Sequence, residues 1–352
     1  MSPLLQRPAR SAIGSFLIIG AIVGGSAAAF AFTAGWFSPN RLTPQKMLQA
    51  LAPADGSAPG RRRNHIKGIC FTGFFEASGN GAALSSASLV TRGRYPAIGR
   101  FNLGTADPNA ADATVRVRGM GLRITSSGGQ EWRMAMIDPP FFPVSTPRAF
   151  HDMLIASANK DPDAMKAFIA QNPEYEAFAE WARTAPFTGS YAEERYNSLD
   201  SFVFTDDFGV DRTVRWSFLP AATPTVLSGD ELVRRGPDFL EQEISERVRN
   251  GPLRWTMIAI VANPGDPTND PSKAWPEERR TVDVGTLVVQ QIEPEPDGPC
   301  RDINFDPTVL PNGIKPSDDP FPAARSSVYR VSYDLRTSEA KDYPRTGAGA
   351  EK

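Results

Sequence analysis

A charge-free stretch near the N-terminus constrains the architecture of this chain most. Residues 11–40 carry no charged side chain, and the run SAIGSFLIIGAIVGGSAAAFAFTAGWF is apolar or small throughout. About 20 such residues suffice to cross a bilayer. Arg7 and Arg10 precede the run, and positive charges before a span predict an N-terminus inside and a C-terminal part outside. Residues 1–37 are therefore predicted to form a signal-anchor that crosses the membrane once.

A cleaved signal peptide is the alternative for the same stretch, with small residues at 27–34 as the candidate cleavage site. The apolar run is long for a signal peptide, which favours the anchor. Trp36 and Phe37 would then lie at the outer interface. Both interpretations export the rest of the chain. We predict a single-pass protein of the inner membrane with a periplasmic domain, or a soluble periplasmic protein after cleavage.

Composition excludes several classes of partner. The 352 residues include 41% hydrophobic ones, enough for a sizeable core in one large domain or two, and the net charge is −2. No basic helix or stripe is visible, so we predict no nucleic-acid partner. No dinucleotide-binding glycine motif is present, so no bound NADPH is expected. Export permits a disulfide between Cys70 and Cys300, but Cys70 lies in an apolar run, which favours buried, unpaired thiols.

Hydrophobic periodicity predicts an α+β fold. The alternating segments favour a β-barrel of antiparallel strands with helices packed outside. Thr146 and Asp161 are predicted caps of the second and third helices, and the tail 337–352 is predicted to be disordered. Strands are expected at 65–73, 97–103, 113–125, 131–137, 201–206, 212–219, 252–262 and 281–291, and helices at 43–51, 146–158, 162–171, 174–184, 229–234 and 237–250.

One further helix is predicted in the segment SDDPFPAARSSVYRVSYDLR. Asp319 can cap it, and Pro320 suits its first turn. Arg325 and Tyr329 are four residues apart and meet on one face, and Arg336 follows seven residues later on the same stripe. A guanidinium beside a phenol favours the phenolate, which is a known axial ligand of haem iron. On this helix alone, arginines that simply face water are the favoured interpretation.

Four motifs in order change that interpretation. They are Arg62, His65, Lys67 and Gly68; Arg100-Phe101; Arg118-Gly119 with Met120, Gly121 and Leu122; and Arg325 with Tyr329. Together they resemble the catalase superfamily, and most closely the short, membrane-associated or periplasmic catalase-related peroxidases. The match spans about 40 to 337 and implies an eight-stranded antiparallel barrel. It would be a minimal core at 65–336 without the C-terminal domain of longer catalases, preceded by a helix and entry arm at 38–64.

The resemblance implies haem as cofactor, in its b-type form, iron protoporphyrin IX. Tyr329 would be the iron ligand, and Arg325 would hold its phenolate charge. Haem propionates suit bidentate guanidinium partners. The resemblance assigns that role to Arg62, Arg100 and Arg336. Phe141, with Phe142 beside it, would line the distal face of the haem.

The resemblance makes His65 the distal acid–base. An imidazole of ordinary pKa near roughly 6.5 can take a proton from the bound peroxide and return it to the leaving oxygen. Asn102 stands where catalases often carry a serine that assists this histidine. The family's distal asparagine is missing, and Asp138 is the nearest polar substitute. An ionised carboxylate cannot donate a hydrogen bond, so Asp138 must be protonated or turned away. His151 is expected on a helix surface without a catalytic role.

The expected function is a haem-dependent peroxidase with weak catalase activity. It would reduce hydrogen peroxide or organic hydroperoxides with a small organic electron donor. A hydroperoxide-rearranging haem enzyme, similar to an allene oxide synthase, and a non-catalytic haem-binding or sensing protein are the alternatives. Association into a homo-oligomer is compatible with the resemblance.

Overall fold

The computed structural model describes residues 10–33, 38, 40–52, 56 and 58–346. Contacts divide the chain into two units, 1–43 and 44–352. The first contains helix α1 (Arg10–Thr33), of which Gly14–Thr33 is long and apolar enough to cross a membrane. A signal sequence meets the same criterion, so both interpretations of this stretch stay open. Trp36 and Phe37, expected at the interface, lie outside the described residues.

Eight antiparallel strands close a barrel in the second unit, as predicted. Each strand hydrogen-bonds to the next in the order β10-β11-β1-β2-β3-β4-β6-β8, and β8 pairs with β10 to complete the ring. Strands β7 (Phe202–Thr205) and β12 (Ile314–Pro316) extend the sheet beyond β8. The barrel strands are β1 (Gly68–Ala77), β2 (Gly93–Leu103), β3 (Arg118–Thr125), β4 (Glu131–Ile137), β6 (Tyr196–Asn197), β8 (Asp211–Pro220), β10 (Leu253–Val261) and β11 (Thr281–Pro294).

Sequence periodicity located the long strands and missed the short ones. The first strand begins at Gly68 rather than at residue 65, because His65 has a left-handed φ of 51° that a strand cannot contain. The third begins at Arg118, because a 3₁₀ turn occupies 112–114. Strands β5 (Phe187–Thr188), β6, β9 (Val226–Leu227) and β12 have only two or three residues. Such lengths carry no periodic signal.

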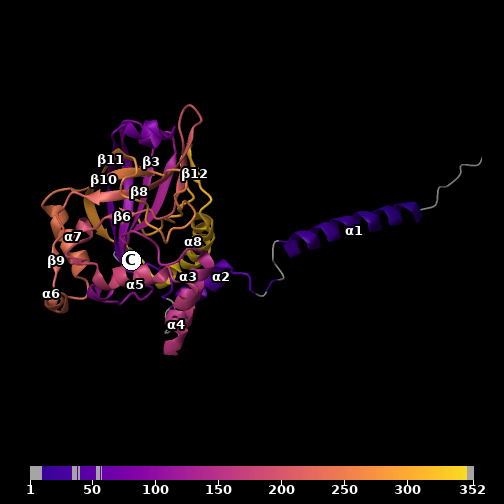
Figure 1. Cartoon of the computed structure of the whole chain (residues 1–352), viewed down its shortest axis with the longest axis horizontal. Helices are drawn as coiled ribbons and strands as arrows, with labels where there is room; N and C mark the ends of the chain where they lie inside the picture. Colours follow the sequence, from indigo (N-terminus) through magenta and orange to yellow (C-terminus); the bar gives the residue numbers. More distant parts are fainter. Residues whose placement is uncertain (1–9, 34–37, 39, 53–55, 57, 347–352) are drawn as a thin grey trace, which may run out of the picture. The chain divides into compact units, whose positions relative to one another are not determined.

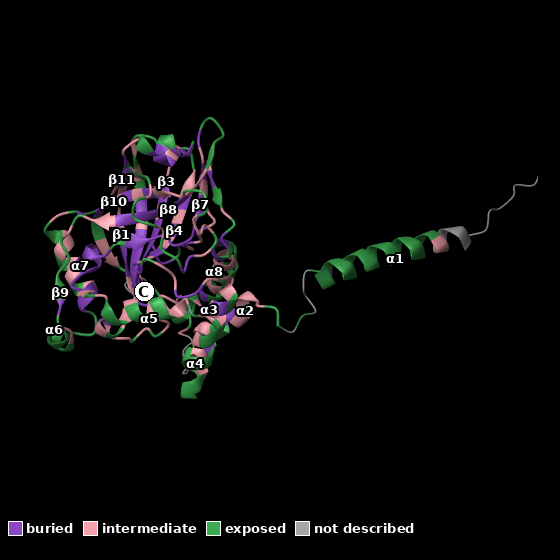
Figure 2. Ribbon diagram, in the orientation of Figure 1, coloured by how far each residue is buried: buried purple, intermediate pink, exposed green. Residues whose placement is uncertain are grey.

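Alternate strand residues fill the barrel with buried aromatic side chains. In Figure 2 much of the barrel strands has the colour of buried residues. The rings of Phe101 and Trp255 lie 5.5 Å apart, and Phe101 stacks on Tyr191 at the same distance. A side chain at Gly99 would place Cβ 2.1 Å from the ring of Phe71, so only glycine fits there. Because β2 turns Phe101 inward, its neighbours Arg100 and Asn102 belong to the outer face of the barrel.

Helices cover the outside of the barrel, and Figure 1 shows several of them gathered around one end. The N-caps Thr146, Asp161 and Asp319 each accept a backbone N–H bond, as predicted. Helix α2 packs against α3 and α8, and α7 packs against β11. The helices of this unit are α2 (Pro44–Leu51), α3 (Pro147–Ala158), α4 (Pro162–Gln171), α5 (Tyr175–Thr184), α6 (Gly229–Arg234), α7 (Phe239–Arg249) and α8 (Pro320–Ser338).

Two expectations from the sequence are wrong. Cys70 and Cys300 form a disulfide across 230 residues; an apolar neighbourhood is compatible with a disulfide as well as with a free thiol. The segment predicted to be a disordered tail is ordered up to residue 346. Helix α8 continues to Ser338, a 3₁₀ turn follows at 340–342, and Arg345 donates to Asp302 at 2.7 Å. Residues 347–352 lie outside the described part.

Candidate active site

His65 lies in the irregular segment that leads into β1, with its backbone held from β2. Arg100 donates from Nη1 to the carbonyl of His65 at 2.7 Å and from Nη2 to that of Ile66 at 2.9 Å. The imidazole Nδ1 lies 2.7 Å from Oδ1 of Asn102. An amide oxygen can only accept, so this contact assigns the proton to Nδ1 and leaves Nε2 as the basic nitrogen. The structure thus brings together His65 and Asn102, as predicted.

Burial lowers the pKa of His65 from its usual 6.5 to about 4. The hydrogen bond to Asn102 raises it, but the charges of Arg100, Arg325 and Arg62 lower it further. The half-buried ring is therefore neutral at neutral pH. A neutral imidazole beside several guanidinium groups can accept a proton from a weak acid.

Arg325 and Tyr329 meet on one face of α8, as their spacing predicts. Arg325 Nη2 lies 3.1 Å from the phenol oxygen of Tyr329 and 2.9 Å from the carbonyl oxygen of Ala135 on β4. Its Nη1 donates to Asp200 at 2.6 Å. Burial lowers the pKa of Arg325, but the charges of Tyr329 and Asp200 outweigh burial and raise it above its usual value. This guanidinium therefore stays charged beside the phenol oxygen of Tyr329.

Asp200 was missed by the sequence reasoning. It is buried, and it follows a short strand 125 residues before Arg325. Burial raises the pKa of Asp200, and the charge of Arg325 opposes that rise. No local motif marks such a residue, because its partner comes from another part of the chain.

A second cluster contains Arg62, Arg100 and Arg336. Arg62 donates from Nε to Glu295 at 3.1 Å, and Arg100 donates from Nη2 to the other oxygen of Glu295 at 2.7 Å. Arg336 is buried, and its hydrogen bonds go to backbone carbonyls only. Within the described part of the chain it has no ion pair. Burial and then the charge of Arg62 lower the pKa of Arg336 to about 9.

These charges fit a ligand that carries two carboxylates. Arg62 and Arg100 share one carboxylate, Glu295, and the buried Arg336 has no carboxylate partner among the described residues, so positive charge is in excess in this cluster. An uncompensated buried charge is costly unless an anion joins it. Haem has two propionates and an iron that takes a phenolate ligand. Burial lowers the pKa of Arg62, and the charge of Tyr329 opposes this shift. The cluster therefore lies within electrostatic reach of the pair Arg325–Tyr329.

Asp138, the expected distal substitute, has close polar partners on β3 and just before it. Its carboxylate accepts from the backbone N–H of Arg118 at 2.8 Å and from Arg116 at 2.9 Å. Burial and the nearby charge of Glu194 raise its pKa to about 7. Of the two options left by the sequence, the structure shows a carboxylate turned toward Arg116. A distal role for Asp138 stays a prediction.

Phe141, Phe142 and His151 are the other residues that the sequence analysis singled out. Phe141 is half-buried, and its role in lining the haem stays a prediction. Its neighbour Phe142 packs on Phe150 and Phe321, with ring centroids 5.1 and 4.9 Å away. His151 lies on α3, where Nδ1 contacts Asp152 at 2.9 Å.

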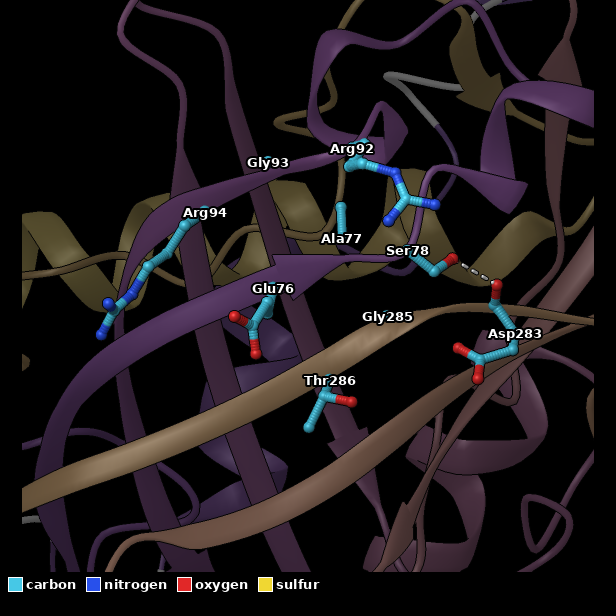
Figure 3. A pocket seen from close by; sticks show the side chains of 9 residues that line it. All are labelled: Glu76, Ala77, Ser78, Arg92, Gly93, Arg94, Asp283, Gly285 and Thr286. Carbon is cyan, nitrogen blue, oxygen red and sulfur yellow. Dashed lines mark hydrogen bonds between the residues drawn. The ribbon is translucent and has the colours of Figure 1, made fainter.

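An open hollow of about 530 Å³ lies at the far end of β1 from His65. Figure 3 shows its lining of Glu76, Arg92, Asp283 and their neighbours, where Ser78 donates to the carbonyl of Asp283 at 2.8 Å. Glu76 in its lining comes eight residues after Gly68, the start of β1, which corresponds to about 26 Å of strand. This hollow therefore has no part in the chemistry of His65 and Tyr329.

An eight-stranded barrel whose neighbouring segments carry a histidine and a tyrosine–arginine pair defines a protein of the catalase fold. The family model described as Catalase matches residues 27–341. A catalase-related peroxidase of Synechococcus elongatus is 35% identical over 86% of this chain and 91% of its own length. One from Mycolicibacterium paratuberculosis is 32% identical over 84% and 95%. The chain belongs to the catalase family, and it is an oxidoreductase that acts on peroxide.

Solved catalases share the fold at low identity. A fungal catalase superposes with a TM-score of 0.70 and 19% identity over 80% of this chain and 60% of its own. Catalase A from Saccharomyces cerevisiae gives 0.69 and 20% over 78% and 61%. The chain thus spans about three fifths of these catalases, which agrees with the predicted minimal core.

Proposed function

We propose that this protein is a haem-dependent peroxidase that reduces hydrogen peroxide, or organic hydroperoxides, with a small organic electron donor. The observation that carries the proposal is the excess of positive charge formed by the buried Arg100 and Arg336 and the partly buried Arg62, together with a phenol held by Arg325. Bound haem b would supply the redox chemistry that cleaves the O–O bond. The two relatives named catalase-related peroxidases support this class of reaction.

His65 would move the proton. Its neutral ring, with Nδ1 bonded to Asn102, presents Nε2 to the peroxide. Nε2 takes a proton from one peroxide oxygen and returns it to the other, so that the second oxygen leaves as water. Asn102 holds the ring in the required orientation and tautomer. Because the pKa of His65 is about 4, the base form is available throughout the neutral range.

Tyr329 would bind the iron as a phenolate. Arg325 stabilises the negative charge through its hydrogen bond of 3.1 Å, and Asp200 holds the guanidinium in place. An anionic ligand directs electron density toward the metal and favours O–O cleavage. The propionates would join Arg62, Arg100 and Arg336 and balance their excess charge.

Helix α1 would tether the domain to the inner membrane with the catalytic unit in the periplasm. Its length and apolar character support this location. A small reductant from that compartment would supply the electrons. Association of several copies is compatible with the proposal and is not needed for the site.

The test is the absorption spectrum of the full chain, expressed with haem, before and after hydrogen peroxide. We expect one haem per chain, and oxidation of a phenolic donor when peroxide is added. Tyr329→Phe should lose the phenolate spectrum, whereas the control Tyr333→Phe, one turn later on α8, should retain it. Haem that binds without reacting would favour the sensor alternative. Rearranged products from a lipid hydroperoxide would favour the allene oxide synthase-like alternative, and absence of haem from the wild type would refute the proposal.

A further inference from the structure

The disulfide joins β1 to the segment that holds the arginine cluster. Cys70 lies on β1, between its register partners Arg100 on β2 and Glu293 on β11. Cys300 lies in the irregular segment 295–305, which follows β11. The sequence has two cysteines, so this bond is the one covalent cross-link that the chain can form within itself.

Backbone carbonyl oxygens of the segment 300–303, which begins at the disulfide, accept hydrogen bonds from Arg62 and Arg336. Arg62 donates to the carbonyl oxygen of Cys300 at 2.9 Å and to that of Ile303 at 3.2 Å. Arg336 donates to the same carbonyl of Ile303 at 3.0 Å. Both arginines also donate to the carbonyl of Arg301. The segment 300–303 therefore determines where two guanidinium groups point.

The backbone hydrogen bonds of the segment are local turns, and side-chain bonds from Arg301 to the carbonyl of Tyr343 and from Arg345 to Asp302 connect it to the C-terminal part of the chain. Gly298 N–H donates to Pro294, and the N–H of Ile303 donates to Cys300. The segment also lies tightly on the cross-link, since a Cβ added at Gly298 would be 2.5 Å from Sγ of Cys70. Cys70, Cys300, Ile303 and Phe305 form one buried apolar cluster. The disulfide thus fastens the carbonyls to the strand that runs beside Arg100.

Repulsion between the two guanidinium groups favours such a restraint. Burial and the charge of Arg62 lower the pKa of Arg336, which means that the two guanidinium groups repel each other. Groups that repel move apart unless their acceptors are held in place. An anion binds more tightly to donors that already stand in its binding geometry, because no ordering cost is paid on binding.

We propose that the Cys70–Cys300 disulfide is a positioning element that orients Arg62 and Arg336 for the two carboxylates of a bound porphyrin, so that porphyrin loading depends on the redox state of the cysteines. The inference rests on the proposed haem site. Reduction by a phosphine opens the S–S bond: two thiols form with protons from water, and the phosphine takes the oxygen of that water and becomes its oxide. In the reduced form the segment 300–303 moves, and the arginines lose their orientation.

The experiment compares two ligands on the full chain in detergent. Haem and haem dimethyl ester, whose propionates are blocked, are titrated into the oxidised wild type and into the double variant Cys70→Ser/Cys300→Ser. We expect the dissociation constant for haem to rise at least tenfold in the variant, with little change for the dimethyl ester. A merely structural loss would weaken both ligands alike, so only the disulfide-dependent orientation of the arginines predicts this difference.

Several results would overturn the inference. Equal haem affinity in the wild type and the double variant does so, and so does an equal loss for haem and its ester. Should the variant fail to fold, the wild type reduced by tris(2-carboxyethyl)phosphine is titrated with zinc protoporphyrin IX, whose metal the phosphine does not reduce; unchanged affinity again refutes the inference. A wild type that binds neither porphyrin refutes the haem site itself, which separates failure of the proposed function from failure of the inference.

Discussion

Acid should destabilise this fold through His65. The ring has a pKa of about 4 in the folded chain and about 6.5 when unfolded. Between these values the unfolded chain binds the proton and the folded chain does not, so stability falls as the pH drops from about 6.5 to about 4. Above pH 6.5 the effect vanishes. At pH 5 this difference in proton binding lowers the free energy of unfolding by at most about 2 kcal/mol.

The assay is urea unfolding of the haem-free chain at pH 7 and pH 5, followed by tryptophan fluorescence. Other groups titrate in the opposite sense. Asp138, Glu241 and Asp319 have pKa values raised to about 7, so they favour the folded chain as the pH falls. These three carboxyl groups are present in both the wild type and His65→Gln. Subtracting the pH-dependent change in unfolding free energy of the variant from that of the wild type therefore removes their contribution. We expect the wild type to lose about 2 kcal/mol more than His65→Gln between the two pH values.

The second histidine of the chain provides the matched control. His151→Gln retains His65 and should therefore show the same acid-induced loss as the wild type. An equal loss in His65→Gln and the wild type would refute the reasoning, because it would mean that His65 is not held neutral by burial and by the neighbouring arginines.

The remaining predictions concern buried charges and close packing. Lys67→Ala should destabilise the fold by about 3–5 kcal/mol in urea unfolding, because Lys67 pairs at 2.7 Å with the fully buried Asp112; a loss below 1 kcal/mol would show that water reaches the carboxylate. Gly99→Ala should cost at least about 1–3 kcal/mol and lower Tm, since its Cβ would lie 2.1 Å from a phenylalanine ring carbon, and an unchanged Tm contradicts the packing. Asp200→Asn should raise the midpoint potential of bound haem iron, because Arg325 would withdraw more charge from the phenolate once its 2.6 Å carboxylate partner is gone; an unchanged or lower potential contradicts this role.

Local features of this protein were predictable because they depend on residues a few positions apart. The cap of α8, the pairing of Arg325 with Tyr329 and the alternation of the long strands follow from helix and strand geometry within one segment. The resemblance in motif order also predicted the barrel, and it predicts a catalytic role for His65. The helix and strand predictions needed only spacing and residue type.

Tertiary structure alone decided the partners. Glu295 pairs with arginines more than 190 residues earlier, Asp200 reaches Arg325 across 125 residues, and Cys70 bonds to Cys300 across 230. None of these pairs produces a periodic pattern in the sequence. Which distant segments meet is determined by the closure of the barrel, in which β8 pairs with β10. The chain specifies its elements by local hydrogen bonding and apolar periodicity, whereas burial and closure select which charges face one another.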